Sequence, residues 1–82
     1  MKVERVICWY STINDKLLGE INIDNIPVAE LRNILNVDND DLEVYKIYSI
    51  SKDQLSKLIH FVPELSTIKL KNIELFVECF QL

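Results

Sequence analysis

The sequence predicts an α+β domain: a mainly antiparallel four-stranded sheet, in the order ββαβαβ, with two helices packed on one face. Segments rich in β-branched and aromatic residues occur near both ends, and two segments between them repeat apolar residues at helical spacing. With 82 residues, one glycine and two prolines, the chain has room for one core and little for linkers. We therefore predict that residues 1–82 form a single domain with both helices on one side of the sheet.

The first two predicted strands form a hairpin. Residues Glu4–Ser11 place apolar side chains on both faces of an extended chain, which predicts a central strand. After a polar turn at residues 12–16, the next run alternates, with apolar or small residues at Leu17, Gly19, Ile21 and Ile23. Such alternation indicates a strand with one buried face, paired antiparallel to the first.

A proline and an apolar periodicity predict the first helix. Pro27 suits the first helical turn, where its missing N–H is not needed. The apolar residues that follow at helical spacing are Val28, Leu31, Ile34 and Leu35. We expect Asn36 to end this helix in a left-handed conformation and residues 37–43 to form an acidic connection.

A third strand and a second helix are predicted next. Val44–Ile50 is rich in β-branched and aromatic residues and is expected to be the strand. Ser51 and Gln54 fit a capping box, in which each side chain bonds the other residue's backbone N–H. The buried stripe of this helix is expected to be Leu55, Leu58, Ile59 and Val62, and Pro63 should stop it.

The last segment, residues 68–82, fits two structures. The residues Ile73, Leu75, Val77 and Cys79 alternate with more polar or aromatic positions, as in a strand. The residues Leu70, Ile73, Val77 and Phe80 also fit the apolar stripe of a helix. We favour the strand because phenylalanine and β-branched residues are frequent here.

Negative charge is concentrated in one stretch. Between Glu20 and Glu43 there are seven acidic residues against one base, Arg32, while the net charge of the whole chain is −4. A one-signed acidic patch repels nucleic acid and anionic lipid and attracts basic protein surfaces. Nucleic-acid binding is excluded further because phosphate contacts need clustered lysine or arginine.

The densest acidic segment is the candidate partner-binding site. Its residues are Asp38, Asp40, Asp41 and Glu43, followed directly by Tyr45 and Tyr48. The carboxylates would supply charge complementarity, and one or both tyrosines an apolar anchor, because tyrosine is frequent in binding hot spots. A solvated acidic turn without a partner is the alternative interpretation of the same residues.

Metal and catalytic chemistry lack the residues that they need. As a calcium loop starting at Asp38, the segment has Glu43 where glycine is required and Ser49 where the bidentate glutamate is required. Cys8 and Cys79 have no metal-ligand spacing and are expected to be buried, reduced thiols. His60, the only histidine, should be exposed on the second helix, and one glycine cannot make a phosphate loop. We expect that the protein is not an enzyme and binds no cofactor or metal. A mechanism that uses only a pair of carboxylates is the one kind of catalysis left open.

The beginning of the chain and its longest apolar runs bear on location. Lys2, Glu4 and Arg5 stand where a secretory signal should be apolar, and runs such as Val6–Tyr10 are far too short to span a membrane. We therefore expect a cytoplasmic protein.

Two motifs resemble a family of small bacterial proteins. The segment Tyr48–Leu58, with a tyrosine, an isoleucine two residues on, a glutamine four later and then a leucine, is similar to their pattern, and Phe76–Phe80 resembles their aromatic-Glu-Cys-aromatic tail. These are the immunity proteins of polymorphic toxin and contact-dependent growth inhibition systems. The resemblance covers about half of the chain and carries no site residues over, because such proteins vary most where they touch their toxins.

This resemblance implies a protein that binds and neutralises a cognate toxin domain. A basic, nucleic-acid-cleaving toxin would match the acidic surface by charge. The alternative hypothesis is a non-catalytic regulatory or scaffold subunit, which binds a stable protein partner or forms a homodimer through an exposed sheet edge.

Overall fold

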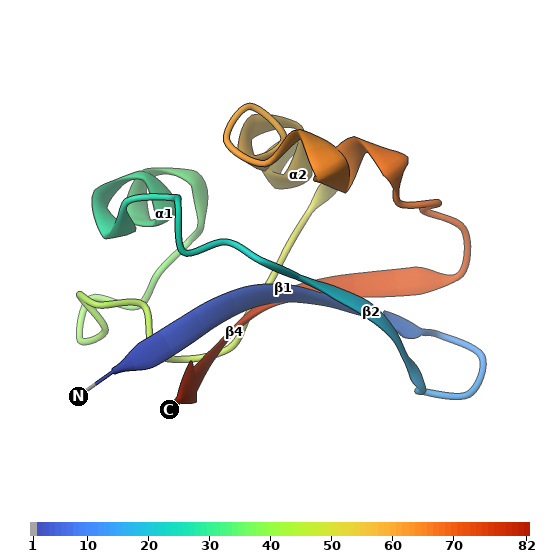
Figure 1. Cartoon of the computed structure of the whole chain (residues 1–82), viewed down its shortest axis with the longest axis horizontal. Helices are drawn as coiled ribbons and strands as arrows, with labels where there is room; N and C mark the ends of the chain where they lie inside the picture. The colour runs from blue at the N-terminus through green and yellow to red at the C-terminus, as the bar shows by residue number, and fades with distance from the viewer. Residues whose placement is uncertain (1) are drawn as a thin grey trace.

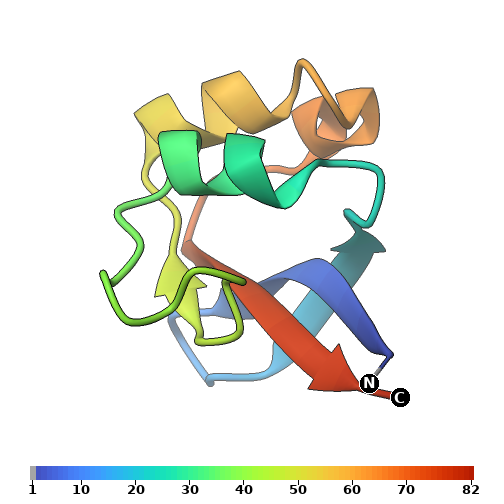
Figure 2. The same ribbon diagram turned by 90° about the vertical axis from the view of Figure 1, so that its left-hand side faces the viewer.

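The computed structural model describes residues 2–82 and has a four-stranded antiparallel sheet with two helices over one face (Figures 1 and 2). The elements are β1 (Val3–Ser11), β2 (Leu17–Asn22), α1 (Val28–Ile34), β3 (Tyr48–Ser49), α2 (Lys52–Leu58), the 3₁₀ helix η1 (Pro63–Thr67) and β4 (Ile73–Gln81). The predicted α+β class, the order ββαβαβ and the antiparallel sheet are confirmed.

The two strands from the ends of the chain lie side by side in the middle of the sheet, whose order is β2-β1-β4-β3. β1 and β4 pair over their full length, from Val3 opposite Gln81 to Ser11 opposite Ile73. This pairing determines the structure of the last segment, which the sequence left ambiguous. Residues 73–81 form a strand, because they pair with all nine residues of β1 through hydrogen bonds that a helix could not make.

The register of the sheet separates its two faces. Ile7 lies opposite both Val77 and Ile21, and Trp9 lies opposite Leu75, so these side chains share the helix-facing side. The core on this side is completed by Ile23, Ile26, Leu31, Leu35, Val44, Ile50, Leu55, Leu58, Val62 and Leu65. The apolar positions of the two predicted helices therefore face the sheet, as their spacing required.

The capping box at the start of α2 is present as predicted. The Ser51 Oγ accepts a hydrogen bond from the Gln54 N–H at 3.1 Å, and the Ser51 N–H donates to Gln54 Oε1 at 2.8 Å. A cap of this kind contributes about 1 kcal/mol to stability.

We expect Ser51→Ala to lower the free energy of unfolding by about 1 kcal/mol, because it removes the acceptor of the Gln54 N–H. Urea unfolding followed by circular dichroism measures this change. Ser56→Ala is the matched control, since Ser56 is exposed in the same helix and bonds only the Asp53 carbonyl. Alanine favours the helix interior, so the control should not be destabilised. An equal loss in both variants would contradict a specific role of the cap.

Three boundaries differ from the sequence-based expectations. The third strand was expected over Val44–Ile50 but is only Tyr48–Ser49, because Val44 turns into the core with φ at 57°. Asn36 does not end α1 in a left-handed conformation; the helix ends at Ile34 and the buried Leu35 is extended. α2 ends at Leu58, and Pro63 begins η1 instead of stopping α2 directly; Val62, the residue before the proline, lies outside the helical region, as is usual at this position.

Candidate functional site

Residues 38–46, here called the acidic loop, connect α1 to β3 at one end of the molecule (Figure 2). Asp38 and Asp40 share one cation: the Lys46 Nζ lies 3.2 Å from Asp38 Oδ2 and 3.0 Å from Asp40 Oδ1. All three side chains are largely exposed to solvent. Part of the charge that the sequence concentrates here is therefore neutralised within the loop itself.

Asp41 lies inside the acidic loop, although the sequence predicted it on the surface. Asp41 is only 6% exposed. Its carboxylate accepts hydrogen bonds from the Tyr45 N–H at 2.9 Å, the Lys46 N–H at 2.9 Å and the Tyr48 hydroxyl at 2.6 Å. These donors use both carboxylate oxygens. Asp41 holds the loop in shape and does not present its charge to a partner.

The titration of the acidic loop follows from these contacts. Burial alone would raise the pKa of Asp41, but the Tyr48 hydroxyl and the two backbone amides outweigh it and leave this pKa below its ordinary value. Burial and the Asp41 carboxylate together raise the pKa of Tyr48. Hydrogen bonds to Asp40 and Asp38 raise the pKa of Lys46 above its ordinary value. The loop thus carries an ionised Asp41 and a charged Lys46 at neutral pH.

The two candidate tyrosines differ in exposure. Tyr48 is half-buried and packs on the core, and its hydroxyl donates to Asp41. Tyr45 is 45% exposed, and the Arg5 guanidinium lies 5.7 Å from the centre of its ring. Arg5 also donates a hydrogen bond to the Glu43 carbonyl. Of the two, only Tyr45 offers a large exposed aromatic surface.

Val44 occupies a conformation that β-branched residues rarely adopt. Its φ is 57° and its side chain is fully buried in the core. A non-glycine residue held in this region costs about 1–3 kcal/mol and persists only where its surroundings fix it. The core packing of Val44 provides part of that constraint. The Asp41 carboxylate provides the rest, because it accepts hydrogen bonds from the N–H groups of Tyr45 and Lys46, which follow Val44.

Of the six residues predicted to bind a partner, Asp38, Asp40, Glu43 and Tyr45 are exposed, whereas Asp41 is buried and Tyr48 is half-buried. Sequence reasoning missed Arg5 and Lys46, the two cations that contact the loop. Lys46 could have been recognised as an internal counter-ion, because it follows the acidic run directly. Nothing in the order of residues marks Arg5, which lies 38 positions from Glu43.

The free thiols are poorly reactive. Cys8 is buried, and its burial, with Glu78 and Glu20 nearby, raises its pKa to about 12. Cys79 is half-buried, less than expected, and its pKa is also raised, mainly by burial. A nucleophilic cysteine needs a lowered pKa, so neither thiol has the character of a catalytic group.

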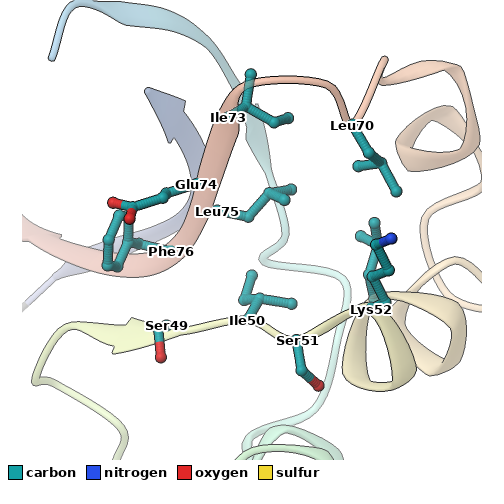
Figure 3. A pocket seen from close by; sticks show the side chains of 10 residues that line it. Ser49, Ile50, Ser51, Lys52, Leu70, Ile73, Glu74, Leu75 and Phe76 are labelled. Carbon is teal, nitrogen blue, oxygen red and sulfur yellow. The ribbon is translucent and has the colours of Figure 1, made fainter. Parts of the chain in front are cut away.

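A cavity of about 340 Å³ opens between the β3–α2 connection and the start of β4 (Figure 3). The side chains of Ile50, Leu70, Ile73 and Leu75 point into this gap, whereas Glu74 points to the opposite side of β4. The lining is completed by Ser49, Ser51, Lys52, Leu55 and Phe76. No histidine or cysteine lines it, and the Ser51 hydroxyl is engaged in the helix cap.

The described part of the chain offers neither a metal-binding cluster nor a membrane-spanning helix. Over residues 2–82, no group of three or more histidine, cysteine, aspartate or glutamate side chains is placed to hold a metal ion. Within the same residues, no helix has the length and apolar character needed to cross a membrane. His60 lies exposed in the turn after α2 and away from the cavity lining.

Comparison with known proteins identifies a family for this chain. No curated protein and no solved structure matches this sequence. A family model described as a domain of unknown function, DUF7683, matches residues 4–78, which include every strand and helix of the fold except the last residues of β4 and the first of β1. The chain therefore belongs to the DUF7683 family.

Proposed function

We propose that this protein is an immunity protein, which binds a basic, nucleic-acid-cleaving toxin domain and neutralises it through the acidic loop. The observation that carries the proposal is the buried Asp41, whose three hydrogen bonds fix a loop that presents Asp38, Asp40 and Glu43 to solvent. A loop that is already ordered loses less conformational entropy on binding. Tyr45 beside these carboxylates supplies an apolar anchor.

Electrostatics supports a basic partner. Four acidic residues and one lysine leave the acidic loop with three net negative charges. Such a field speeds association with a basic surface, and the effect weakens as salt is added. Binding that inactivates the partner needs no catalytic group on this chain, which agrees with the raised thiol pKa values and with the apolar cavity.

The test begins with capture of the partner from native cells by the tagged protein, followed by association kinetics with the purified partner. We expect Asp40→Lys with Glu43→Lys to slow association about tenfold at low salt, because both side chains are exposed and steer the encounter. Asp41 is left unchanged, since its replacement would disturb the fold.

Asp53→Lys with Glu64→Lys is the matched control. These residues are exposed on α2 and η1 and change the net charge of the chain by the same amount. Equal slowing by both pairs would assign the effect to overall charge and remove the acidic loop from the interface. Capture of a partner whose toxicity this protein does not suppress on co-expression would contradict the immunity function.

A scaffold or self-associating protein is the second candidate, and one observation favours it. β2 is an edge strand of the sheet, and its Leu17 and Leu18 are exposed. An exposed apolar edge strand can pair with a second chain. Sedimentation equilibrium of the free protein tests this: a dimer that Leu18→Lys dissociates would support pairing through β2, and a monomer would exclude it.

A further inference from the structure

The side of the sheet opposite the helices is an extended surface of its own, here called the open face. Figures 1 and 2 show α1 and α2 on one side of the sheet, and within residues 2–82 no helix covers the other side. The register assigns to the open face the residues Glu4, Val6, Cys8, Tyr10, Glu20, Asn22, Glu74, Phe76, Glu78 and Phe80. It spans three neighbouring strands, β2, β1 and β4.

The open face is acidic and carries no base among the strand residues that the structure places there. Its four carboxylates are Glu4, Glu20, Glu74 and Glu78, and they come from all three strands. Arg5 is the only lysine or arginine in the four strands, and it lies on the helix-facing side, against Glu43 and Tyr45. The open face is thus separate from the acidic loop and, unlike it, has no internal counter-ion in its strands.

The centre of the open face is an ordered aromatic platform. Val6 and Cys8 are only 3% and 1% exposed, although no helix covers them in the described chain. The rings of Tyr10 and Phe76 meet edge to face, with centroids 5.9 Å apart, and the Tyr10 hydroxyl donates to Glu78 Oε2 at 2.6 Å. These contacts fix the large side chains before any partner arrives, which lowers the entropic cost of binding.

Exposed apolar groups extend this platform at both ends. Phe80, at the end of β4, is 44% exposed, and Leu17, which lies opposite Tyr10 in β2, is 52% exposed. Figure 3 shows the side chains of Glu74 and Phe76 next to each other, on the opposite side of β4 from those of Ile73 and Leu75. The surface therefore combines apolar area with negative charge, a combination that suits an amphipathic and basic partner.

We propose that the open face is the docking surface for a basic amphipathic helix of a protein partner. β1 and β4 are nine residues each, about 30 Å long, which a helix of about 20 residues spans. The axes of three strands cover about 10 Å, which matches the width of a helix. A helix there would bury the second face of the sheet, as helices on both faces do in three-layer folds. A second copy of this chain is disfavoured, because stacking two open faces brings two sets of four glutamates together.

The test uses a synthetic peptide of about 20 residues, with leucines at helical spacing and lysines elsewhere, titrated into the ¹⁵N-labelled protein. We expect backbone amide shifts on β1, β2 and β4, with an affinity that falls as salt rises. A peptide with glutamate in place of every lysine should not bind. Shifts confined to the acidic loop, or no saturable binding of the basic peptide, would overturn the proposal.

Two variant pairs separate this surface from the acidic loop. Glu20→Lys with Glu74→Lys reverses two exposed charges of the open face and leaves the Tyr10–Glu78 contact in place; we expect at least about tenfold weaker peptide binding. Asp40→Lys with Glu43→Lys should change the affinity by no more than about twofold, as its charges lie outside the open face. Equal losses in both pairs would overturn the proposal.

Two controls complete this test: the folding of each variant and the oligomeric state of the protein. Circular dichroism verifies that each variant folds, and Glu20→Gln with Glu74→Gln replaces the reversal if it does not, with a smaller loss expected. Sedimentation equilibrium of the free protein detects a dimer; a dimer that the open-face variant dissociates would identify a second copy as the occupant and overturn the proposal. Failure of the immunity function leaves this peptide result unaffected, because the two experiments probe different surfaces.

Discussion

Replacement of Asp41 by alanine should lower the free energy of unfolding by about 3 kcal/mol. The substitution leaves the Tyr45 N–H, the Lys46 N–H and the Tyr48 hydroxyl without the acceptor that they share in the folded protein. Hydrogen bonds to a charged group contribute about 1.5–3 kcal/mol, and a donor left unpaired in a buried site costs a similar amount. This loss is a large fraction of the stability of a small domain.

Urea unfolding at neutral pH measures this loss, and Asp40→Ala is the natural control. Asp40 is the preceding residue, its side chain is 76% exposed, and it pairs only with Lys46 in the described structure. Exposed ion pairs contribute about 0–1 kcal/mol, so the control should be nearly neutral. If the two alanine variants lose the same stability, the internal role of Asp41 is refuted.

The lowered pKa of Asp41 also predicts how stability depends on pH. Because the folded pKa lies below the ordinary value of 3.8, Asp41 contributes stability at any pH above 3.8, and this contribution is lost as the pH falls through the folded value. We expect the urea midpoint of Asp41→Asn to fall less between pH 7 and pH 3 than that of the unmodified protein. Part of the acid dependence should remain, because the Arg5 N–H and Asn22 also lower the pKa of Asp24. Parallel pH profiles of the two proteins would contradict this assignment.

Replacement of Gly19 by alanine should destabilise the protein by about 2 kcal/mol, within the range for overpacking. A Cβ at this position would lie 2.3 Å from Trp9 Cζ2 and 2.7 Å from Trp9 Cε2. The φ of Gly19 is not positive, so backbone strain plays no part. In the absence of Trp9, alanine in a strand would be as good as glycine or better. The destabilisation therefore depends on the indole ring.

A double-mutant cycle with Trp9→Leu tests this explanation. Gly19→Ala should cost clearly less in the Trp9→Leu background than in the unmodified protein, since the smaller side chain leaves room for the Cβ. Trp9 is the only tryptophan, so its fluorescence spectrum reports directly whether the ring moves in Gly19→Ala. Equal costs in both backgrounds would show that the Trp9 ring is not responsible.

The sequence by itself determined the elements that depend on neighbouring residues. The strand at residues 4–11 followed from its β-branched and aromatic content, and the cap of α2 followed from Ser51 and Gln54 at fixed spacing. The apolar stripes of the two helices followed from their period. All of these are local patterns, in which side-chain direction is set by the geometry of a single element.

The tertiary structure decided what depends on contacts between distant segments. The pattern of residues 73–81 favoured a strand without excluding a helix, and pairing with β1 shows that they form a strand. The four acidic residues of the loop are chemically alike in the sequence, yet only Asp41 is buried, because the backbone turns at Val44 and brings Tyr45, Lys46 and Tyr48 around it. Burial is set by which segments meet in space, and the order of residues along one segment does not contain that information.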